Sequence, residues 1–123
     1  GFLRKVFEVF EAYRTSIDMI ATSEVAVSLT IDDPSSLQEI KRALAAYGAV
    51  EVENEQTIIC VVGDFRTSRV GSAPEIFDAL DKIPVKMISY GGSDNSVSIL
   101  INTKDKIQAL NSLSKNIFSK NDK

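Results

Sequence analysis

Apolar and polar positions follow one another along the chain in an order that occurs twice. Residues 1–14 carry apolar side chains at helical spacing, with charged side chains on the opposite face. Residues 16–20 and 25–31 alternate between polar and apolar, which predicts two strands of a hairpin. A second helix is predicted over residues 37–45, and a further strand over residues 49–53. The first part of the chain is therefore expected to run helix, strand, strand, helix, strand.

The pattern starts again after a continuous apolar run at residues 57–62. Such a run predicts a buried strand at the centre of a sheet. A helix is expected around residues 76–83, and alternating positions predict strands over residues 85–88 and 97–101. A last helix is expected to carry its apolar stripe at Ile107, Leu110, Leu113 and Ile117.

Two stretches of the sequence resemble each other, SIDMIATSEVAVSLTI from Ser16 and VKMISYGGSDNSVSILI from Val85. Both carry a Met-Ile pair in the first strand, at Met19 and Met87, and a Val-Ser-apolar pattern in the second strand. Self-similarity of this kind indicates two copies of one structural unit.

The order of helices and strands in each copy matches an α+β ferredoxin-like βαββαβ unit, which is an antiparallel sheet with both helices on one face. We assign residues 1–54 to the first unit and residues 55–123 to the second. The first unit lacks its opening strand and the second lacks its closing strand, so each sheet has an edge for another strand to cover. The chain begins at Gly1 inside a helical pattern, without Met, and we expect it to be part of a longer protein.

Composition excludes several classes of partner. The 14 basic and 17 acidic residues give a formal net charge of -3, and the basic residues are scattered, whereas a nucleic-acid surface needs them clustered. No apolar run approaches the roughly 20 residues that span a membrane. The one cysteine, Cys60, lies in an apolar run and is predicted to be a buried thiol, which fits a reducing, cytoplasmic location.

Catalytic chemistry is not expected from this sequence. The chain has no His, which excludes His-based acid–base catalysis, Ser-His-Asp and Cys-His nucleophiles and His metal sites. One cysteine cannot make a thiolate zinc site. No pair of carboxylates is marked as catalytic, so we predict neither catalytic residues nor a metal.

The most informative polar positions are residues 16–18 and 22–24, predicted to form a corner near the start of the first helix at Phe2. A free amino acid needs N–H groups or hydroxyls for its carboxylate and acidic groups for its ammonium. Two acids, Asp18 and Glu24, favour a ligand with a second cation, such as lysine. On the residues alone, an ordinary hairpin corner is the commoner explanation.

The second corner, residues 89–95, is rich in glycine, and Lys86 occupies the position that matches Asp18. It is either a degenerate copy of the first corner or a flexible turn, and the turn is the simpler interpretation.

Residues 1–30 closely resemble the regulatory region of aspartokinases, above all the lysine-sensitive type. That family carries a GFL-x-x-VF helix followed by S-V/I-D-L/M-I-x-T-S-E-V-x-V-S/A-L-T, present here as GFLRKVF and SIDMIATSEVAVSLT. The second copy also fits, through Gly71, residues 76–77 and residues 87–91.

The resemblance implies two tandem ACT domains that follow a kinase domain, which phosphorylates aspartate with ATP and Mg in lysine, threonine and methionine synthesis. It implies feedback inhibition by lysine bound to the first ACT unit at an interface between the two chains of a homodimer. No cofactor is expected within these residues. The family's site also uses residues upstream of the GFL motif. The matching contacts here are Phe2, Leu3, Ser16, Ile17, Asp18, Thr22, Ser23 and Glu24.

Two other functions remain open at this point. One is a structural dimerisation module that binds no ligand. The other is the threonine-sensing ACT pair of a bifunctional aspartokinase–homoserine dehydrogenase.

Overall fold

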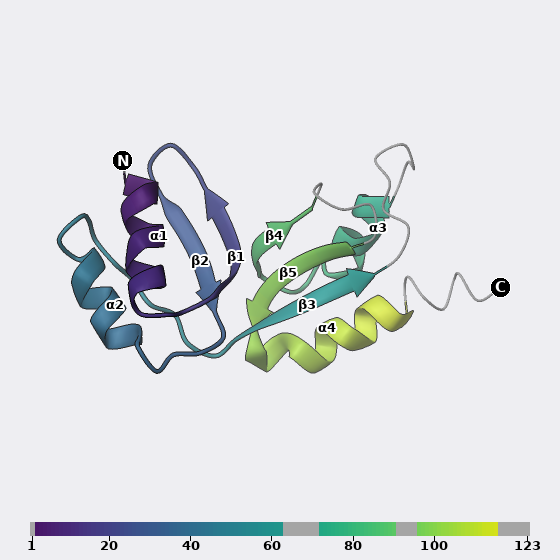
Figure 1. Cartoon of the computed structure of the whole chain (residues 1–123). Coiled ribbons are helices and arrows are strands. Elements are labelled where there is room, and N and C mark those ends of the chain that lie inside the picture. Colours follow the sequence, from purple (N-terminus) through teal and green to yellow (C-terminus); the bar gives the residue numbers. More distant parts are fainter. Residues whose placement is uncertain (1, 63–71, 91–95, 116–123) are drawn as a thin grey trace. The chain divides into compact units, whose positions relative to one another are not determined.

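The computed structural model describes residues 2–62, 72–90 and 96–115 (Figure 1). It divides into two compact units, Gly1–Val52 and Glu53–Lys123, close to the division expected after residue 54. Each unit combines an antiparallel sheet with helices, as the repeat in the sequence predicts. No helix in the described ranges is long and apolar enough to cross a membrane.

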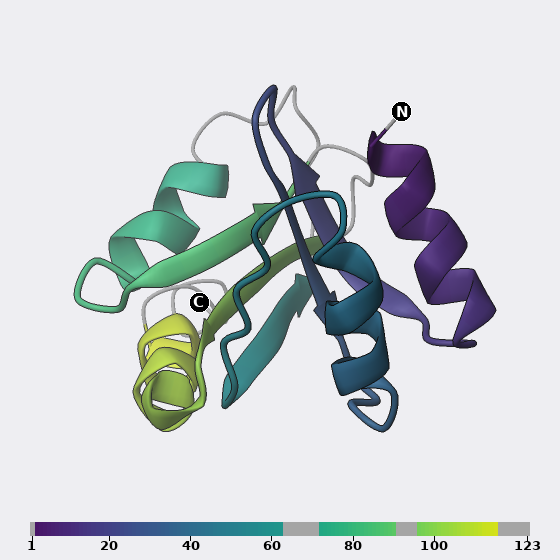
Figure 2. The ribbon, with the colours of Figure 1, turned by 90° about the vertical axis from the view of Figure 1, so that its left-hand side faces the viewer.

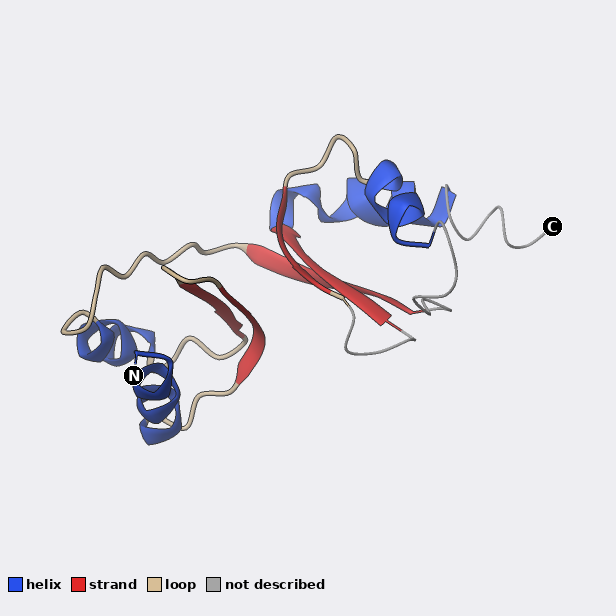
Figure 3. Ribbon diagram, turned by 90° about the horizontal axis from the view of Figure 1, so that it is seen from above, coloured by secondary structure: helices blue, strands red, loops and turns tan. Residues whose placement is uncertain are grey.

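The first unit contains two helices and a hairpin. Their order along the chain is α1 (Phe2–Ala12), β1 (Ile17–Thr22), β2 (Val27–Ile31) and α2 (Leu37–Leu44). β1 and β2 pair antiparallel, and both helices lie on one face of the hairpin (Figure 3). Val6 and Phe10 of α1 and Ile40 of α2 are buried together, with Ile17 and Leu29 packed against them.

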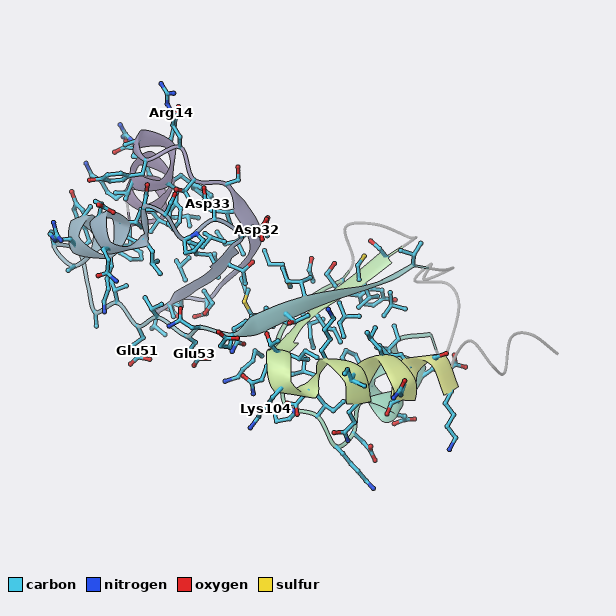
Figure 4. The ribbon with its side chains drawn as sticks, turned by 90° about the horizontal axis from the view of Figure 1, so that it is seen from below. Arg14, Asp32, Asp33, Glu51, Glu53 and Lys104 are labelled. Atoms are coloured by element: carbon cyan, nitrogen blue, oxygen red, sulfur yellow. The ribbon has the colours of Figure 1, made fainter. Side chains whose placement is uncertain are left out.

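The C-terminal cap of α1 sets the direction in which the chain enters β1. Arg14 adopts a left-handed backbone conformation with a φ of 52° (labelled in Figure 4). The N–H of Thr15 donates a hydrogen bond of 2.9 Å to the carbonyl of Phe10, which is the closing bond of a Schellman motif. The chain therefore reverses here, and β1 runs back along α1.

The second unit contains a three-stranded sheet. Its order along the chain is β3 (Gln56–Val62), α3 (Ser72–Ala79), β4 (Val85–Ser89), β5 (Ser96–Asn102), the short 3-10 helix η1 (Thr103–Asp105) and α4 (Lys106–Leu113). The strands lie in the order β3-β5-β4, all antiparallel, which places the first strand beside the third as in a βαββαβ unit. Figure 2 gives a second view of this sheet and its helices. The buried core is Ile59, Val61, Ile76, Ala79, Leu80, Ile83, Val97, Ile99, Ile101, Ala109 and Leu113.

The strand predicted over residues 49–53 is absent, and this prediction was wrong. The backbone there makes no ladder. The closing strand of a βαββαβ unit pairs with the opening strand, which the first unit lacks. Without a neighbouring strand, the N–H and C=O groups of a segment cannot form the inter-strand hydrogen bonds that make a sheet.

The strand at residues 57–62 is confirmed, but its predicted central position was wrong. β5 is the central strand and β3 is an edge strand in the described sheet. Because the helices cover one face of this sheet (Figure 3), only alternate residues of β3, Ile59 and Val61, are buried, and Cys60 on the other face is exposed rather than buried.

The apolar stripe predicted for the last helix is buried only in part: Leu113 lies in the core, and Ile117 lies outside the described residues. Ala109 and Leu113 are buried, four residues apart, whereas Ile107 is 74% exposed and Leu110 is 44% exposed. The fully buried Ala109 belongs to the core of the second unit, which a pattern of large apolar residues could not indicate.

Candidate functional site

A β-bulge in β1 carries Asp18. Ile17 lies opposite Ile31 and Met19 lies opposite Thr30, so a step of two residues in β1 faces a step of one residue in β2. A bulge of this kind leaves its extra residue outside the ladder and redirects its side chain. The Asp18 side chain is exposed, while that of the following residue, Met19, is buried in the first unit.

Thr30 holds this bulge in place. The N–H of Met19 donates a hydrogen bond of 2.9 Å to the side-chain oxygen Oγ1 of Thr30. The hydroxyl thus satisfies a donor at the irregular step in the ladder. Sequence reasoning placed Thr30 in a motif but gave it no role, because the role depends on strand register and not on any periodic pattern.

The turn between β1 and β2 contains the second group of predicted contacts. The N–H of Ser23 donates to the carbonyl of Ala26 at 2.8 Å, and Oγ of Ser23 accepts from the N–H of Val25 at 3.4 Å. Ser23 therefore shapes the turn, as the simpler interpretation of a polar corner expects. Thr22 and Glu24 on either side of it are exposed.

The structure separates the eight predicted contact residues into two groups instead of one corner. Thr22 comes four residues after Asp18 in the same strand, which corresponds to about 13 Å at about 3.3 Å per residue. β1 was predicted to end at residue 20, and its continuation through Thr22 causes this separation.

The first helix begins at the end of the unit where the β1–β2 turn lies, because α1 and β1 run in opposite directions (Figure 1). Phe2 and Leu3, exposed by 47% and 40%, therefore belong with the turn group at residues 22–24. Residues 16–18 form the other group, at the end of α1. We call Phe2, Leu3 and residues 22–24 the turn group, and residues 16–18 the start group.

The two acids of the site are free to receive a cation. Neither the Asp18 nor the Glu24 carboxylate forms a hydrogen bond or an ion pair with any described residue, and both side chains are exposed. Glu8 of the same unit, in contrast, pairs with Arg4 at 2.9 Å. Among the described residues no group of three or more acidic or thiol side chains could hold a metal ion.

One carboxyl of the first unit has a shifted pKa. The backbone N–H of Ser35 donates to Oδ1 of Asp33 at 3.0 Å, in the turn before α2, and this bond lowers the pKa of Asp33. A bond to the ionised form favours that form. Asp33 (labelled in Figure 4) lies on the loop after β2 and is not one of the predicted contacts.

The second unit repeats the bulge with the opposite charge. In β4, Val85 lies opposite Ile101 and Met87 lies opposite Leu100, so Lys86 occupies the bulge position. The match between Lys86 and Asp18 in the sequence is therefore also a structural match. Most of the predicted second corner, residues 91–95, lies outside the described residues.

Comparison with known proteins identifies the family. An ACT domain model matches residues 59–117. The chain is 32% identical to lysine-sensitive aspartokinase 3 of Escherichia coli over 96% of its length, and 37% identical to an aspartokinase of Candida albicans over 92%. It covers 28% and 22% of those two proteins, so it spans about a quarter of their length.

Solved structures give the same answer. A structure from Porphyromonas gingivalis, described as a C-terminal regulatory domain of aspartate kinase, is 50% identical and has a TM-score of 0.86, with 95% of this chain and 80% of that chain covered. Aspartokinase III of E. coli in complex with lysine and aspartate has a TM-score of 0.83 at 32% identity, with 96% of this chain and 28% of that chain covered. The chain therefore belongs to the family of ACT-type regulatory domains of aspartate kinase.

Proposed function

We propose that the chain is the lysine-sensing module of an aspartokinase, and that it regulates the kinase without catalysing a reaction itself. The observation that supports this most directly is the pair of exposed carboxylates of Asp18 and Glu24 on the hairpin of the first unit, neither of which has a partner among the described residues. The similar E. coli protein is lysine-sensitive. Phosphoryl transfer from ATP with Mg would belong to a kinase domain outside these residues.

A homodimer would bring the two groups together. β1 pairs with β2 along one edge, and no described strand pairs with its other edge. A symmetric antiparallel pairing of two β1 strands centred on Ile20 sets Asp18 opposite Thr22 of the second copy. Each of two sites would then consist of the start group of one chain and the turn group of the other.

Such a composite site suits the chemistry of lysine. The carboxylates of Asp18 and Glu24 would accept hydrogen bonds from its ammonium groups, and charge-assisted bonds of this kind are the stronger ones. Free N–H groups in the first turn of α1, near Phe2, would receive its carboxylate. Leu3 and Ile17 would contact the aliphatic part of the side chain.

Regulation requires that lysine bind the inhibited state of the kinase more tightly than the active state. Couplings of this type are typically about 1–3 kcal/mol, which corresponds to a change in binding affinity of roughly 5- to 150-fold. Dimerisation through the first unit gives one physical route, because a ligand held between two chains favours the arrangement that forms its site.

Isothermal titration of lysine, threonine and methionine tests the proposal. The titration uses the chain and a longer form with the residues that precede Gly1, and sedimentation velocity is recorded in parallel. We expect lysine alone to give saturable heat and to stabilise the dimer. Heat from threonine instead would support a threonine-sensing ACT pair. A dimer that gives no heat with any amino acid would overturn the proposal in favour of a structural dimerisation module.

A further inference from the structure

Lys86, at the bulge of the second unit, forms an ion pair with Glu53. The ammonium Nζ of Lys86 lies 3.1 Å from Oε2 of Glu53, and the two side chains are 37% and 63% exposed. Asp18, at the matching bulge of the first unit, has no such partner among the described residues. The position that is free to receive a cation in one unit is thus occupied in the other by an ammonium with its counter-ion already in place.

Glu53 stands where the chain enters the second unit. It directly follows Val52, the last residue of the first unit, and precedes β3 (Glu53 is labelled in Figure 4). Residues 53–55 belong to no strand. We call residues 53–55 the entry segment.

Other contacts also hold the entry segment to the second unit. The N–H of Thr103 donates to the carbonyl of Glu55 at 2.8 Å. Nε2 of Gln56 donates to the carbonyl of Asn54 at 3.1 Å and to Oδ1 of Asn102 at 2.9 Å. Nε2 of Gln56 also lies within 3.4 Å of the carbonyl oxygen of Glu55. Because the entry segment has no ladder, these bonds and the Lys86–Glu53 ion pair attach it to the second unit.

We propose that the second unit has exchanged effector binding for an entry clamp, formed by Lys86 and Glu53. In this role Lys86 is a positioning residue: it holds Glu53, the first residue of the second unit, which is joined directly to Val52 of the first unit. The covalent junction between the two units lies at this peptide bond, and the clamp connects it to β4. The same ammonium excludes a cationic effector from the second bulge.

The clamp predicts an effect of limited size. Exposed ion pairs contribute about 0.2–1 kcal/mol, so loss of the pair should raise the opening of the entry segment by about 1.5- to 5-fold. The amide of Thr103 is a suitable probe, because its exchange with solvent requires release of the Glu55 carbonyl. The amide of Ile99 in central β5 serves as an internal reference.

The experiment measures native-state hydrogen exchange of the wild-type chain and of Lys86→Met, Glu53→Gln and the double variant. Lys86→Met and Glu53→Gln should each accelerate exchange at Thr103 relative to Ile99, and the double variant should be no faster than either. Lys82→Met removes an exposed positive charge, four residues before Lys86 in the chain, that has no described ion pair, and it should leave exchange at Thr103 unchanged. The reversed pair, Glu53→Lys with Lys86→Glu, should restore slow exchange.

Equal exchange at Thr103 in Lys86→Met and Lys82→Met would overturn the clamp. So would fully additive effects of Lys86→Met and Glu53→Gln, because independent effects mean that the two residues do not act as a pair. No effector is present in these measurements. Failure of lysine binding and failure of the clamp are therefore separate outcomes.

Discussion

Met19 donates its backbone N–H to the hydroxyl of Thr30, across the hairpin of the first unit, at 2.9 Å. This bond stabilises the bulge that lifts Asp18 out of the ladder. In the second unit Leu100 takes the place of Thr30, opposite Met87, and has no hydroxyl to offer. The first bulge therefore has a side-chain support that the second lacks.

Replacement of Thr30 by Val keeps the shape of the side chain but removes the acceptor. The part-buried N–H of Met19 loses its partner, and we expect unfolding to require about 1 kcal/mol less, since an unpaired buried donor costs about 1–3 kcal/mol. Lysine affinity should also fall, because Asp18 is no longer held in position. Chemical denaturation and isothermal titration measure the two effects. Thr30→Ser retains the hydroxyl and should behave as the wild type. Unchanged lysine affinity in Thr30→Val would show that lysine binding does not depend on this support of the bulge.

The carboxylates of Asp18 and Glu24 should matter for lysine and not for the fold. At 100 times its dissociation constant, lysine should stabilise the wild-type protein by about 2.7 kcal/mol. Asp18→Asn and Glu24→Gln should each lose most of this thermal shift and keep the melting temperature of the ligand-free protein, since neither group has a described partner. Glu11→Gln, an exposed acid on α1, is the matched control. A lysine shift that survives in both variants would argue against these acids as contacts.

Prediction from sequence succeeded where a pattern is local and failed where it depends on neighbouring strands. Helical and alternating periodicity correctly indicated α1, β1, β2, β4 and β5, since each follows from residues close in the chain. The strand at residues 49–53 and the central position of β3 were wrong, because both depend on which strands lie alongside.

The same distinction holds for the candidate site. The match between Asp18 and Lys86 follows from the internal repeat, and the structure confirms it in the two bulges. The support from Thr30 and the ion pair of Lys86 with Glu53 could not be predicted, because they require cross-strand register and a contact between residues 33 positions apart.

Ile20 and Ile88 provide a test of the proposed dimer. The two residues match in the repeat and are similarly exposed, by 39% and 45%. Ile20→Lys would place two ammonium groups together at the centre of a β1–β1 pairing, and we expect the variant to be monomeric in sedimentation velocity and to bind lysine weakly. Ile88→Lys adds the same charge to the second unit and should leave the dimer intact. Loss of the dimer in Ile88→Lys alone would move the interface to the second unit.

The pH dependence of stability should contain a contribution from Asp33. Its pKa is lowered in the folded state from an ordinary value of 3.8, so it contributes stability above that value and loses it as the pH falls through the folded pKa. Asp33→Asn should therefore lower the free energy of unfolding slightly near neutral pH, leave it almost unchanged below the folded pKa, and so flatten the acid side of the stability profile. Chemical denaturation at several pH values below 5 measures how steeply the free energy of unfolding changes with pH. An unchanged slope in the variant would show that the hydrogen bond from Ser35 to Asp33 does not contribute to stability.

The face that α4 turns to the core can be tested by two substitutions of the same kind. Ile99→Ala removes a fully buried side chain of central β5 and should destabilise the protein by about 2–5 kcal/mol, through lost transfer free energy and a cavity. Ile107→Ala removes the same atoms from a side chain that is 74% exposed and should change the free energy of unfolding by less than about 0.5 kcal/mol. Denaturant titration of both variants checks the difference. If Ile107→Ala were as costly as Ile99→Ala, the apolar stripe expected from the sequence would be the face that packs, and α4 would be rotated relative to the orientation described above.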